Sequence, residues 1–364
     1  MRFVIAAGGT GGHLFPGLAV GEVLVARGHE VMLLISEKEI DATATQGRDE
    51  FRIEKLAGIG MPKLFSPAIL GFAWRFWKGL RRCKALFREW RPDAVLGMGG
   101  FTSTAPILAG RSRKMPVFVH ESNAIPGRAN RLNARYVTKV LLGFSECARH
   151  FPNAASEVTG TPLRSALTRR VDKTAALAAF GLKPGRTTLL VMGGSQGAHG
   201  INSAVGNAAA RLKAVAWQVI HLAGAQDEQA MHATYQREGV PAAVAAFHHR
   251  MEEAYGAADL AIARSGAASL AELSHFGLPA ILIPYPFAAD DHQTANARIF
   301  ENAGAGLLVK ESDATPEVLS EKISALIGSR DRLAEMSRQS RKLAPDNAAE
   351  RVADVLLSAC QPNP

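Results

Sequence analysis

Two short glycine-rich turns, each directly after an apolar run, constrain the fold of this chain more than any other feature. The first turn, Gly8–His13, follows the apolar run 3–6, and the second, Gly193–Gly197, follows the apolar run 189–192. Each is typical of a buried strand that passes through a tight turn into a helix. Backbone N–H groups and the positive end of the helix can then approach an anion closely. Two such turns, half a chain apart, predict two similar α/β domains that face each other across a cleft.

Short runs rich in Val, Ile and Leu alternate with longer helical patterns along the whole chain. This alternation predicts βαβ units around parallel sheets, and the apolar character of whole runs predicts helices on both faces of each sheet. A chain of 364 residues is also too long for one ordinary core. We expect strands near residues 3–7, 31–36, 94–98, 117–120 and 139–143, and then near 188–192, 218–223, 244–247, 260–263, 280–284 and 306–309.

The domain boundary is expected within residues 158–163, where glycine and proline interrupt the sequence. Residues 1–160 are then an N-terminal Rossmann-like domain, and residues 161–345 are a C-terminal Rossmann-like domain. Residues 346–364 form a last helix and a tail, for which packing back on the N-terminal domain is one option.

The chain carries a formal net charge of +9. Such an excess indicates an acidic partner, which could be nucleic acid, anionic lipid or a phosphorylated substrate. Cys83, Cys147 and Cys360 are far apart, which predicts a reducing compartment and neither a disulfide framework nor a metal cluster. No signal peptide is evident, and no apolar run approaches the ~18–20 residues that span a bilayer. We therefore expect a cytoplasmic protein that is not integral to a membrane.

Four groups of polar and glycine residues follow predicted strands. Open α/β sheets bind ligands at the carboxyl ends of their strands. We therefore expect one crevice to be lined by residues 99–101, 120–123, 264–266 and 290–293. His13 begins the first helix, where a bound anion or hydroxyl would arrive, although a structural histidine is the alternative.

Other glycine motifs fit less well. A dinucleotide fingerprint would need a third glycine at Leu14, and the chain has no G-K-[S/T], which excludes a P-loop NTPase. The turn 193–197 also matches the G-x-S-x-G nucleophile elbow of hydrolases, with His275 or His292 as a downstream partner. That interpretation leaves the first glycine turn and the group 120–123 without a role.

A diphosphate leaving group needs its developing charge balanced by a metal or by hydrogen-bond donors. No cluster in the sequence has convincing metal spacing, so we expect donors from Ser195, its neighbouring backbone amides, Arg164 and Arg264. Glu272 lies in the helix after Arg264, where a carboxylate can accept hydrogen bonds from vicinal ribose hydroxyls. The alternative for these side chains is ordinary solvent exposure. The acidic pair 290–291 is expected to cap the next helix.

The stretch 64–91 predicts a helix with one apolar stripe for the core, whose residues are spaced three or four apart: Ile69, Phe72, Phe76, Leu80, Cys83 and Phe87. Two tryptophans fall off this stripe, Trp74 and Trp77, among basic residues that include Arg75, Lys78, Arg81 and Arg82. Exposed aromatics in a basic patch fit a helix that lies on an anionic membrane. The alternative is that the tryptophans pack against a neighbouring loop.

Taken together, these segments closely resemble the MurG family of bacterial cell-wall glycosyltransferases, in matching order from residue 3 to about residue 355. The resemblance implies two Rossmann-like domains in the GT-B arrangement and an inverting mechanism. It also implies UDP-N-acetylglucosamine as donor and undecaprenyl-diphospho-muramoyl-pentapeptide as acceptor. The implied location is peripheral, on the cytoplasmic face of the bacterial inner membrane.

The resemblance also places individual residues. Asn123 matches an asparagine beside the sugar, Glu272 a ribose ligand, and Gln293 a contact of the donor sugar. His248 stands where the family has an apolar residue whose backbone reads the uracil. The complete set of expected substrate-binding residues is Thr10, Gly11, Gly12, Asn123, Arg164, Ser195, Gln196, His248, Arg264, Ala267, Ala268, Ser269, Leu270, Ala271, Glu272 and Gln293.

We therefore expect transfer of N-acetylglucosamine to the 4-hydroxyl of the muramoyl lipid, which converts lipid I to lipid II in peptidoglycan synthesis. His13 and Glu121 are the candidates for the general base, and the sequence does not rank them. We expect no cofactor, no metal and no nucleic acid. The expected partners are the two substrates, an anionic membrane surface, and other proteins of cell-wall synthesis and division. The alternatives are a UDP-N-acetylglucosamine 2-epimerase, another lipid glycosyltransferase on the same fold, or a non-catalytic scaffold that binds the UDP-sugar.

Overall fold

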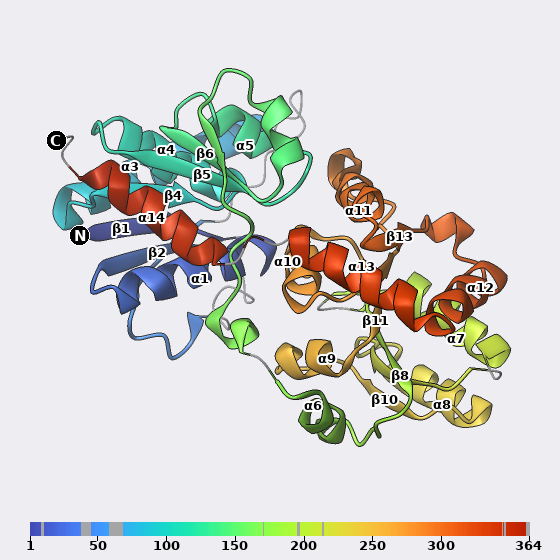
Figure 1. The fold of residues 1–364 in the computed structure, drawn as a ribbon. Helices are drawn as coiled ribbons and strands as arrows, with labels where there is room; N and C mark the ends of the chain where they lie inside the picture. The colour runs from blue at the N-terminus through green and yellow to red at the C-terminus, as the bar shows by residue number, and fades with distance from the viewer. Residues whose placement is uncertain are drawn as a thin grey trace. The chain divides into compact units, whose positions relative to one another are not determined.

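The computed structural model describes residues 1–8, 11–37, 45–57, 68–169, 171–194, 197–212, 215–343, 345 and 347–361. The chain divides into two compact units (Figure 1). The first unit comprises Met1–Ser165 together with Pro345–Pro364, and the second comprises Ala166–Ala344. The division falls between residues 165 and 166, whereas we placed the domain boundary after residue 160 from the sequence.

The first unit is built on a seven-stranded parallel sheet. Its strands are β1 (Arg2–Ala6), β2 (Glu30–Ser36), β3 (Arg52–Leu56), β4 (Ala94–Gly97), β5 (Val117–Glu121), β6 (Lys139–Leu142) and β7 (Ser156–Val158). They lie in the spatial order β3-β2-β1-β4-β5-β6-β7. The α-helices of this unit are α1 (Gly11–Ala26), α3 (Ala68–Trp90), α4 (Thr104–Arg111), α5 (Arg128–Asn133) and α14 (Ala348–Cys360).

Strand β1 explains why whole runs of the sequence are apolar. Successive residues of a strand point to opposite faces of the sheet. Phe3 and Ile5 pack in one apolar cluster with residues of α1 and α14, whereas Val4 and Ala6 pack in another with residues of α3 and α4. Both faces of the strand are therefore covered by helices, as the sequence pattern predicted.

The second unit holds a six-stranded parallel sheet. Its strands are β8 (Thr187–Met192), β9 (Trp217–Leu222), β10 (Ala242–Ala245), β11 (Leu260–Ala263), β12 (Ala280–Leu282) and β13 (Gly306–Leu308), in the spatial order β10-β9-β8-β11-β12-β13. Its α-helices are α6 (Lys173–Ala179), α7 (His199–Ala209), α8 (Glu228–Glu238), α9 (Met251–Ala257), α10 (Ala267–Phe276), α11 (His292–Asn302), α12 (Pro316–Ile327) and α13 (Arg330–Leu343).

The two sheets share one strand order. Numbered within its own unit, each sheet reads 3-2-1-4-5-6, and the first unit adds a seventh strand at its edge. This is the order of a doubly wound, Rossmann-type sheet, in which the crevice for a ligand lies at the carboxyl ends of the strands. The prediction of two α/β domains with parallel sheets is confirmed.

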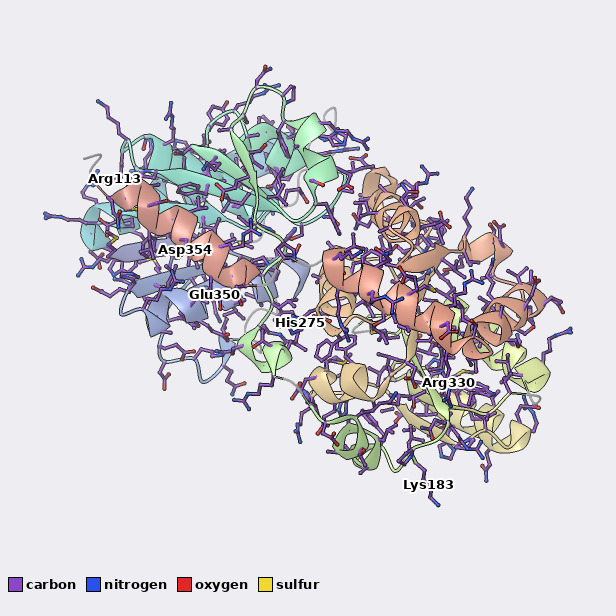
Figure 2. The ribbon with its side chains drawn as sticks, in the orientation of Figure 1. Arg113, Lys183, His275, Arg330, Glu350 and Asp354 are labelled. Atoms are coloured by element: carbon purple, nitrogen blue, oxygen red, sulfur yellow. The ribbon has the colours of Figure 1, made fainter. Side chains whose placement is uncertain are left out.

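The last helix, α14, belongs to the first unit although it ends the described chain. Its apolar residues Val352 and Leu356 join the cluster around α1. Asp354, which is labelled on this helix in Figure 2, forms an ion pair with Arg27 of the first unit at 2.5 Å. The C-terminal segment therefore packs beside elements from the beginning of the chain (Figure 1).

Three strands differ from the sequence predictions, and all three lie at sheet edges. β3 and β7 were not predicted, and they are the two edge strands of the sheet in the first unit. Three of the five residues of β3 are charged, and two of them, Arg52 and Glu54, form an ion pair at 3.2 Å. β10, at the edge of the second sheet, begins two residues earlier than the predicted range. Edge strands tolerate charge and short length, so they lack the apolar signal of central strands.

Candidate active site

His13 lies in the first turn of α1, next to the glycine pair that follows β4. Gly99 and Gly100 both have positive φ angles, 111° and 70°. A Cβ atom at Gly99 would lie only 2.9 Å from Nε2 of His13. Glycine is therefore required at residue 99 on two counts, backbone conformation and space for the imidazole. Of the neighbouring predicted residues, Gly11 and Gly12 begin α1, and Thr10 lies outside the described residues.

Glu121, the last residue of β5, organises the loop that follows it. Its side chain is buried, with the residue only 3% exposed. Oε1 accepts hydrogen bonds from the backbone N and from Nδ2 of Asn123, each at 3.0 Å. Oε2 accepts from the backbone N of Gly127 at 3.0 Å and from Nδ2 of Asn130 at 2.9 Å. Four donors thus surround a carboxylate that the sequence offered as a general base.

His120 is fully buried beside Glu121. Its Nε2 lies 2.8 Å from the carbonyl oxygen of Gly160, which can only accept, so Nε2 carries the proton. The hydroxyl of Ser122 then donates to Nδ1 at 3.2 Å. Burial lowers the pKa of His120, which keeps the imidazole neutral. His120 therefore fixes the position of the chain at Gly160.

Asn130 is a residue of this cluster that the sequence analysis missed. Its Nδ2 donates to the carbonyl oxygen of His120 at 3.0 Å as well as to Glu121, and its buried Oδ1 makes no hydrogen bond within the described residues. The same Nδ2 would lie 3.5 Å from a Cβ built at Gly99. No sequence pattern links Asn130 to these partners, because they meet only through the packing of α5 on the sheet.

Arg164 lies in the first unit, where its guanidinium sits over the ring of Phe15 at 4.2 Å from the ring centre. Phe15 belongs to α1, two residues after His13. The Nε atom of Arg164 is buried and makes no hydrogen bond within the described residues. We predicted this residue in the second domain, and the compact units place it in the first.

The second glycine turn connects β8 to α7. Gly194 and Gly197 have φ angles of 102° and 77°. A Cβ atom at Gly197 would lie 2.2 Å from the carbonyl oxygen of Ala223, so the turn packs directly against the end of β9. Ser195 and Gln196 lie outside the described residues.

A buried polar network fixes the start of α7 behind this turn. Nδ2 of Asn202 donates to the carbonyl oxygen of Ala223 at 2.7 Å and to Asp227 at 2.8 Å, so its Oδ1 faces Nε2 of His221 at 3.0 Å. Nδ1 of His221 lies 2.8 Å from the hydroxyl of Tyr235. Burial lowers the pKa of His221 to about 4, so the ring is neutral.

Helix α10 begins directly after β11 and the short link Arg264–Gly266. Its N-cap residue is Gly266, which has no side chain that could cap the first N–H groups of the helix. Such groups, together with the helix dipole, form an anion-binding site. Glu272 lies further along this helix and accepts a hydrogen bond from the hydroxyl of Tyr255 at 2.5 Å. Of the predicted residues, Ala267 and Leu270 have buried side chains, and the same helix carries Ala268, Ser269 and Ala271.

Arg264 holds the loop that follows β12. Its Nη1 donates to the carbonyl oxygens of Ile283 and Pro284, each at 3.1 Å, and it also pairs with Glu311. The guanidinium lies 5.5 Å from the ring centre of Tyr285. These contacts make Arg264 a positioning group for this loop, and its contact with a diphosphate stays a prediction.

The same loop orients Gln293, the second residue of α11. Its Oε1 accepts from the backbone N of Tyr285 at 2.9 Å, and its carbonyl oxygen accepts from the hydroxyl of Ser265 at 2.8 Å. Asp291 stands at the N-cap position of α11 with φ 50°, but its side chain makes no capping hydrogen bond. The prediction that an acidic side chain caps this helix is therefore wrong for Asp291.

His248 lies between β10 and α9. Its Nε2 is 3.2 Å from Oε2 of Glu253, a carboxylate that also pairs with Arg250 at 2.9 Å. Its ring lies 4.8 Å from the ring of Phe180, measured between centres. The imidazole thus connects this segment to α9 and to the end of α6. The contact of its backbone with uracil stays a prediction.

The tryptophans of α3 are exposed, Trp74 by 63% and Trp77 by 45%. Their rings are stacked, with centres 5.2 Å apart, and the guanidinium of Arg81 lies 4.7 Å from the ring centre of Trp77. Cys83 and Phe87 of the predicted stripe are fully buried. Within the described residues, none of the helices is long and apolar enough to cross a membrane.

Comparison with known proteins follows the same division of the chain. The N-terminal domain profile of glycosyltransferase family 28 matches residues 3–142, and the C-terminal domain profile matches residues 188–352. Among solved structures, Acinetobacter baumannii MurG has a TM-score of 0.80 at 29% identity and covers 98% of this chain and 100% of its own. A putative UDP-N-acetylglucosamine 2-epimerase from Listeria monocytogenes has a TM-score of 0.71 at 12% identity, covers 98% and 96%, and shares the fold alone.

Curated relatives match over nearly the whole chain. The protein from Geobacter sulfurreducens is 37% identical and covers 99% of each chain, and the one from Halothermothrix orenii is 35% identical and covers 94% of this chain and 95% of its own. Both are named UDP-N-acetylglucosamine--N-acetylmuramyl-(pentapeptide) pyrophosphoryl-undecaprenol N-acetylglucosamine transferase. The two parallel sheets and the two domain profiles define a glycosyltransferase of family 28 with the GT-B fold. Within that class, the chain belongs to the MurG family.

Proposed function

We propose that this chain transfers N-acetylglucosamine from UDP-N-acetylglucosamine to the 4-hydroxyl of undecaprenyl-diphospho-N-acetylmuramoyl-pentapeptide, with inversion at the anomeric carbon. The observation that carries this proposal is helix α10, whose first N–H groups lack a side-chain cap and whose Glu272 is held by a buried tyrosine. A helix start and a carboxylate, a few residues apart, match the two parts of a nucleoside diphosphate: phosphate and ribose. Full-length relatives that bear the name of this transferase support the same assignment.

The donor site is proposed in the second unit. The amides at the start of α10 and of the second glycine turn hold the diphosphate, together with Ser195 and Gln196 of that turn. Glu272 accepts hydrogen bonds from the ribose hydroxyls, and the backbone at His248 reads the uracil. Gln293, whose Oε1 is already bonded to the backbone of Tyr285, donates from its amide nitrogen to the sugar.

The acceptor site is proposed in the first unit, around His13 and Asn123. The acceptor oxygen attacks the anomeric carbon as the bond from that carbon to the diphosphate oxygen breaks, and UDP departs with the electron pair. A base must take the proton of the attacking hydroxyl. We assign this proton to His13, because Glu121 already accepts four hydrogen bonds that shape its own loop. Arg164 is the proposed cation for the developing charge of the diphosphate.

One assay tests the transfer. The chain is incubated with UDP-N-acetylglucosamine and a muramoyl-diphospholipid, with and without EDTA, while UDP and lipid-linked disaccharide are measured. We expect UDP release that depends on the acceptor, one disaccharide for each UDP, and a rate that EDTA leaves unchanged, because the proposal includes no metal. Turnover of the UDP-sugar without acceptor would indicate an epimerase instead. Binding of the UDP-sugar without turnover would indicate a scaffold.

We further propose that α3 binds the anionic surface of the cytoplasmic membrane face. Exposed indole rings prefer the interface, and each basic residue near an anionic surface contributes about 1 kcal/mol. This docking would bring the enzyme to its lipid acceptor and to other proteins of cell-wall synthesis and division.

Vesicles test this docking. The double variant Arg75→Glu and Lys78→Glu should bind phosphatidylglycerol vesicles about tenfold more weakly or worse, yet keep its turnover of a short, soluble acceptor analogue. The double variant Arg330→Glu and Arg332→Glu, which makes the same charge change on exposed residues of α13, is the control (Figure 2 labels Arg330). Equal weakening in both variants would contradict docking through α3.

A further inference from the structure

A buried phenol lies next to the carboxylate that we propose as the ribose ligand. Tyr255, on α9, is 2% exposed, and its hydroxyl donates to Oε2 of Glu272 at 2.5 Å. Glu272 lies on α10, so this bond joins two helices of the second unit.

Tyr255 also contacts the strand that leads into the second glycine turn. Its oxygen lies 3.6 Å from the sulfur of Met192, the last residue of β8. Its ring stacks on Phe276 of α10, with ring centres 5.1 Å apart and an angle of 28° between the planes. The phenol is therefore fixed by contacts with β8 and α10 that need no bound ligand.

The helix that carries Tyr255 also supports the segment around His248, where we propose that uracil binds. Glu253, two residues earlier on α9, binds His248 through its carboxylate. Helix α9 thus contacts His248, at the proposed uracil site, through Glu253, and the proposed ribose ligand Glu272 through Tyr255. His275, labelled in Figure 2, follows Glu272 by three residues and marks the course of α10.

We infer that Tyr255 is a positioning residue for donor binding, which orients the carboxylate of Glu272 toward the two ribose hydroxyls before the nucleotide arrives. This inference rests on the proposed function, because it takes Glu272 as the ribose ligand. A glutamate side chain that is ordered in advance loses less conformational entropy when it binds its ligand. Tyr255 itself does not touch the nucleotide.

The test compares the affinities of UDP and 2′-deoxy-UDP by calorimetry in wild type, Tyr255→Phe, Glu272→Ala and the double variant. The deoxy nucleotide lacks one hydroxyl of the proposed pair, so the ratio of the two affinities reports the ribose contact. Tyr255→Phe keeps the ring and removes only the hydroxyl. We expect it to weaken UDP binding about 3- to 10-fold and to weaken 2′-deoxy-UDP binding less. The ratio of the affinity for UDP to the affinity for 2′-deoxy-UDP should therefore fall. The value of kcat at saturating donor should stay close to that of wild type.

The double variant and a matched control complete the design. In the Glu272→Ala background, Tyr255→Phe should have no further effect on UDP affinity, because the carboxylate that it orients is gone. Tyr136→Phe removes a hydroxyl from an exposed tyrosine of the first unit and should leave both affinities unchanged. Thermal unfolding of each variant shows whether the fold is retained.

Each outcome decides something different. If Tyr255→Phe weakens both nucleotides equally, Tyr255 only supports the fold, and the inference is wrong while the ribose role of Glu272 stands. If Glu272→Ala leaves the ratio unchanged, Glu272 is not the ribose ligand, and the donor assignment fails together with the inference. If Tyr255→Phe changes UDP binding further in the Glu272→Ala background, the hydroxyl does not act through that carboxylate, which also overturns the inference.

Discussion

Glu121 is the last residue of β5 in the first unit, and Glu272 lies on the helix that follows β11 in the second unit. The two sheets have the same strand order, yet the two carboxylates are used differently. Glu121 accepts four hydrogen bonds from its own loop and from α5, and it is buried. Glu272 accepts a bond from Tyr255 and lies on a helix whose start has no side-chain cap. One carboxylate builds a loop, and the other is positioned at a proposed anion site.

One fold here supports two kinds of site. In the first unit, side chains from α1, β5 and α5 form a polar cluster with a histidine at its edge, which suits proton transfer. In the second unit, backbone groups at a helix start dominate, which suits a diphosphate. The strand order is shared, so the difference comes from which residues follow each strand.

The largest expected effect distinguishes the proton transfer proposed in the first unit from the donor binding proposed in the second. His13→Ala should lower kcat roughly 10²–10⁴-fold, because it removes the proposed base of the first unit, while the KM for UDP-N-acetylglucosamine changes little. Steady-state kinetics with both substrates varied gives the two constants. His232→Ala, on the exposed side of α8, is the control. A near-normal kcat in His13→Ala would return the role of base to Glu121 or to another group.

Replacement by glutamine should affect stability at Glu121 and donor binding at Glu272. Glu121→Gln turns an amide group toward N–H donors, so it should lower the free energy of unfolding by about 1–3 kcal/mol. Glu272→Gln keeps an oxygen for Tyr255, so its free energy of unfolding should stay within about 0.5 kcal/mol of wild type, while its KM for the donor rises. Urea unfolding and donor kinetics of both variants test this. Equal loss of stability would remove the distinction between the two carboxylates.

Each unit also contains a buried neutral histidine, His120 or His221, and acid should therefore destabilise both. Burial lowers the folded-state pKa of His221 to about 4, from an ordinary value of 6.5, so the unfolded state binds more protons between these pH values. The stability that this histidine contributes is complete above pH 6.5 and decreases as the pH falls toward 4. The loss between pH 6.5 and 5.5 should be about 1 kcal/mol for His221.

Urea unfolding at pH 7.5, 6.5 and 5.5 measures this loss. His221→Gln should reduce the decrease between pH 6.5 and 5.5, and His232→Gln, at an exposed position, should not. A wild-type stability that does not change over this range would show that His221 is not buried in its neutral form. His120, whose pKa burial also lowers, should add a decrease of the same sign.

The sequence predicts those structural features that are determined by residues close together in the chain. The central strands and the second glycine turn were predictable, because an apolar run that is covered on both faces and the positive φ angles of Gly194 and Gly197 each leave a direct mark in the residues. The edge strand β3 left no such mark, since its Arg52 and Glu54 pair with each other at the surface. Predicted strand ends were otherwise correct within a few residues.

The site was predictable only in part, for the same reason. The pattern indicated His13, Glu121 and Glu272, but it could not rank the first two, because the four donors to Glu121 come from a loop and a helix that pack against it. The sequence pattern also did not indicate Tyr255. It reaches Glu272, 17 residues further along the chain, only because α9 and α10 lie side by side. Such roles depend on tertiary packing, which spacing alone does not record.

A crystal structure of this protein with UDP bound tests the proposed donor site most directly. We expect the diphosphate at the first N–H groups of α10 and both ribose hydroxyls on Glu272, with the phenol of Tyr255 still bonded to that carboxylate. UDP bound instead at the cluster of His13 and Glu121, or in the second unit away from Glu272, would contradict the proposed donor site.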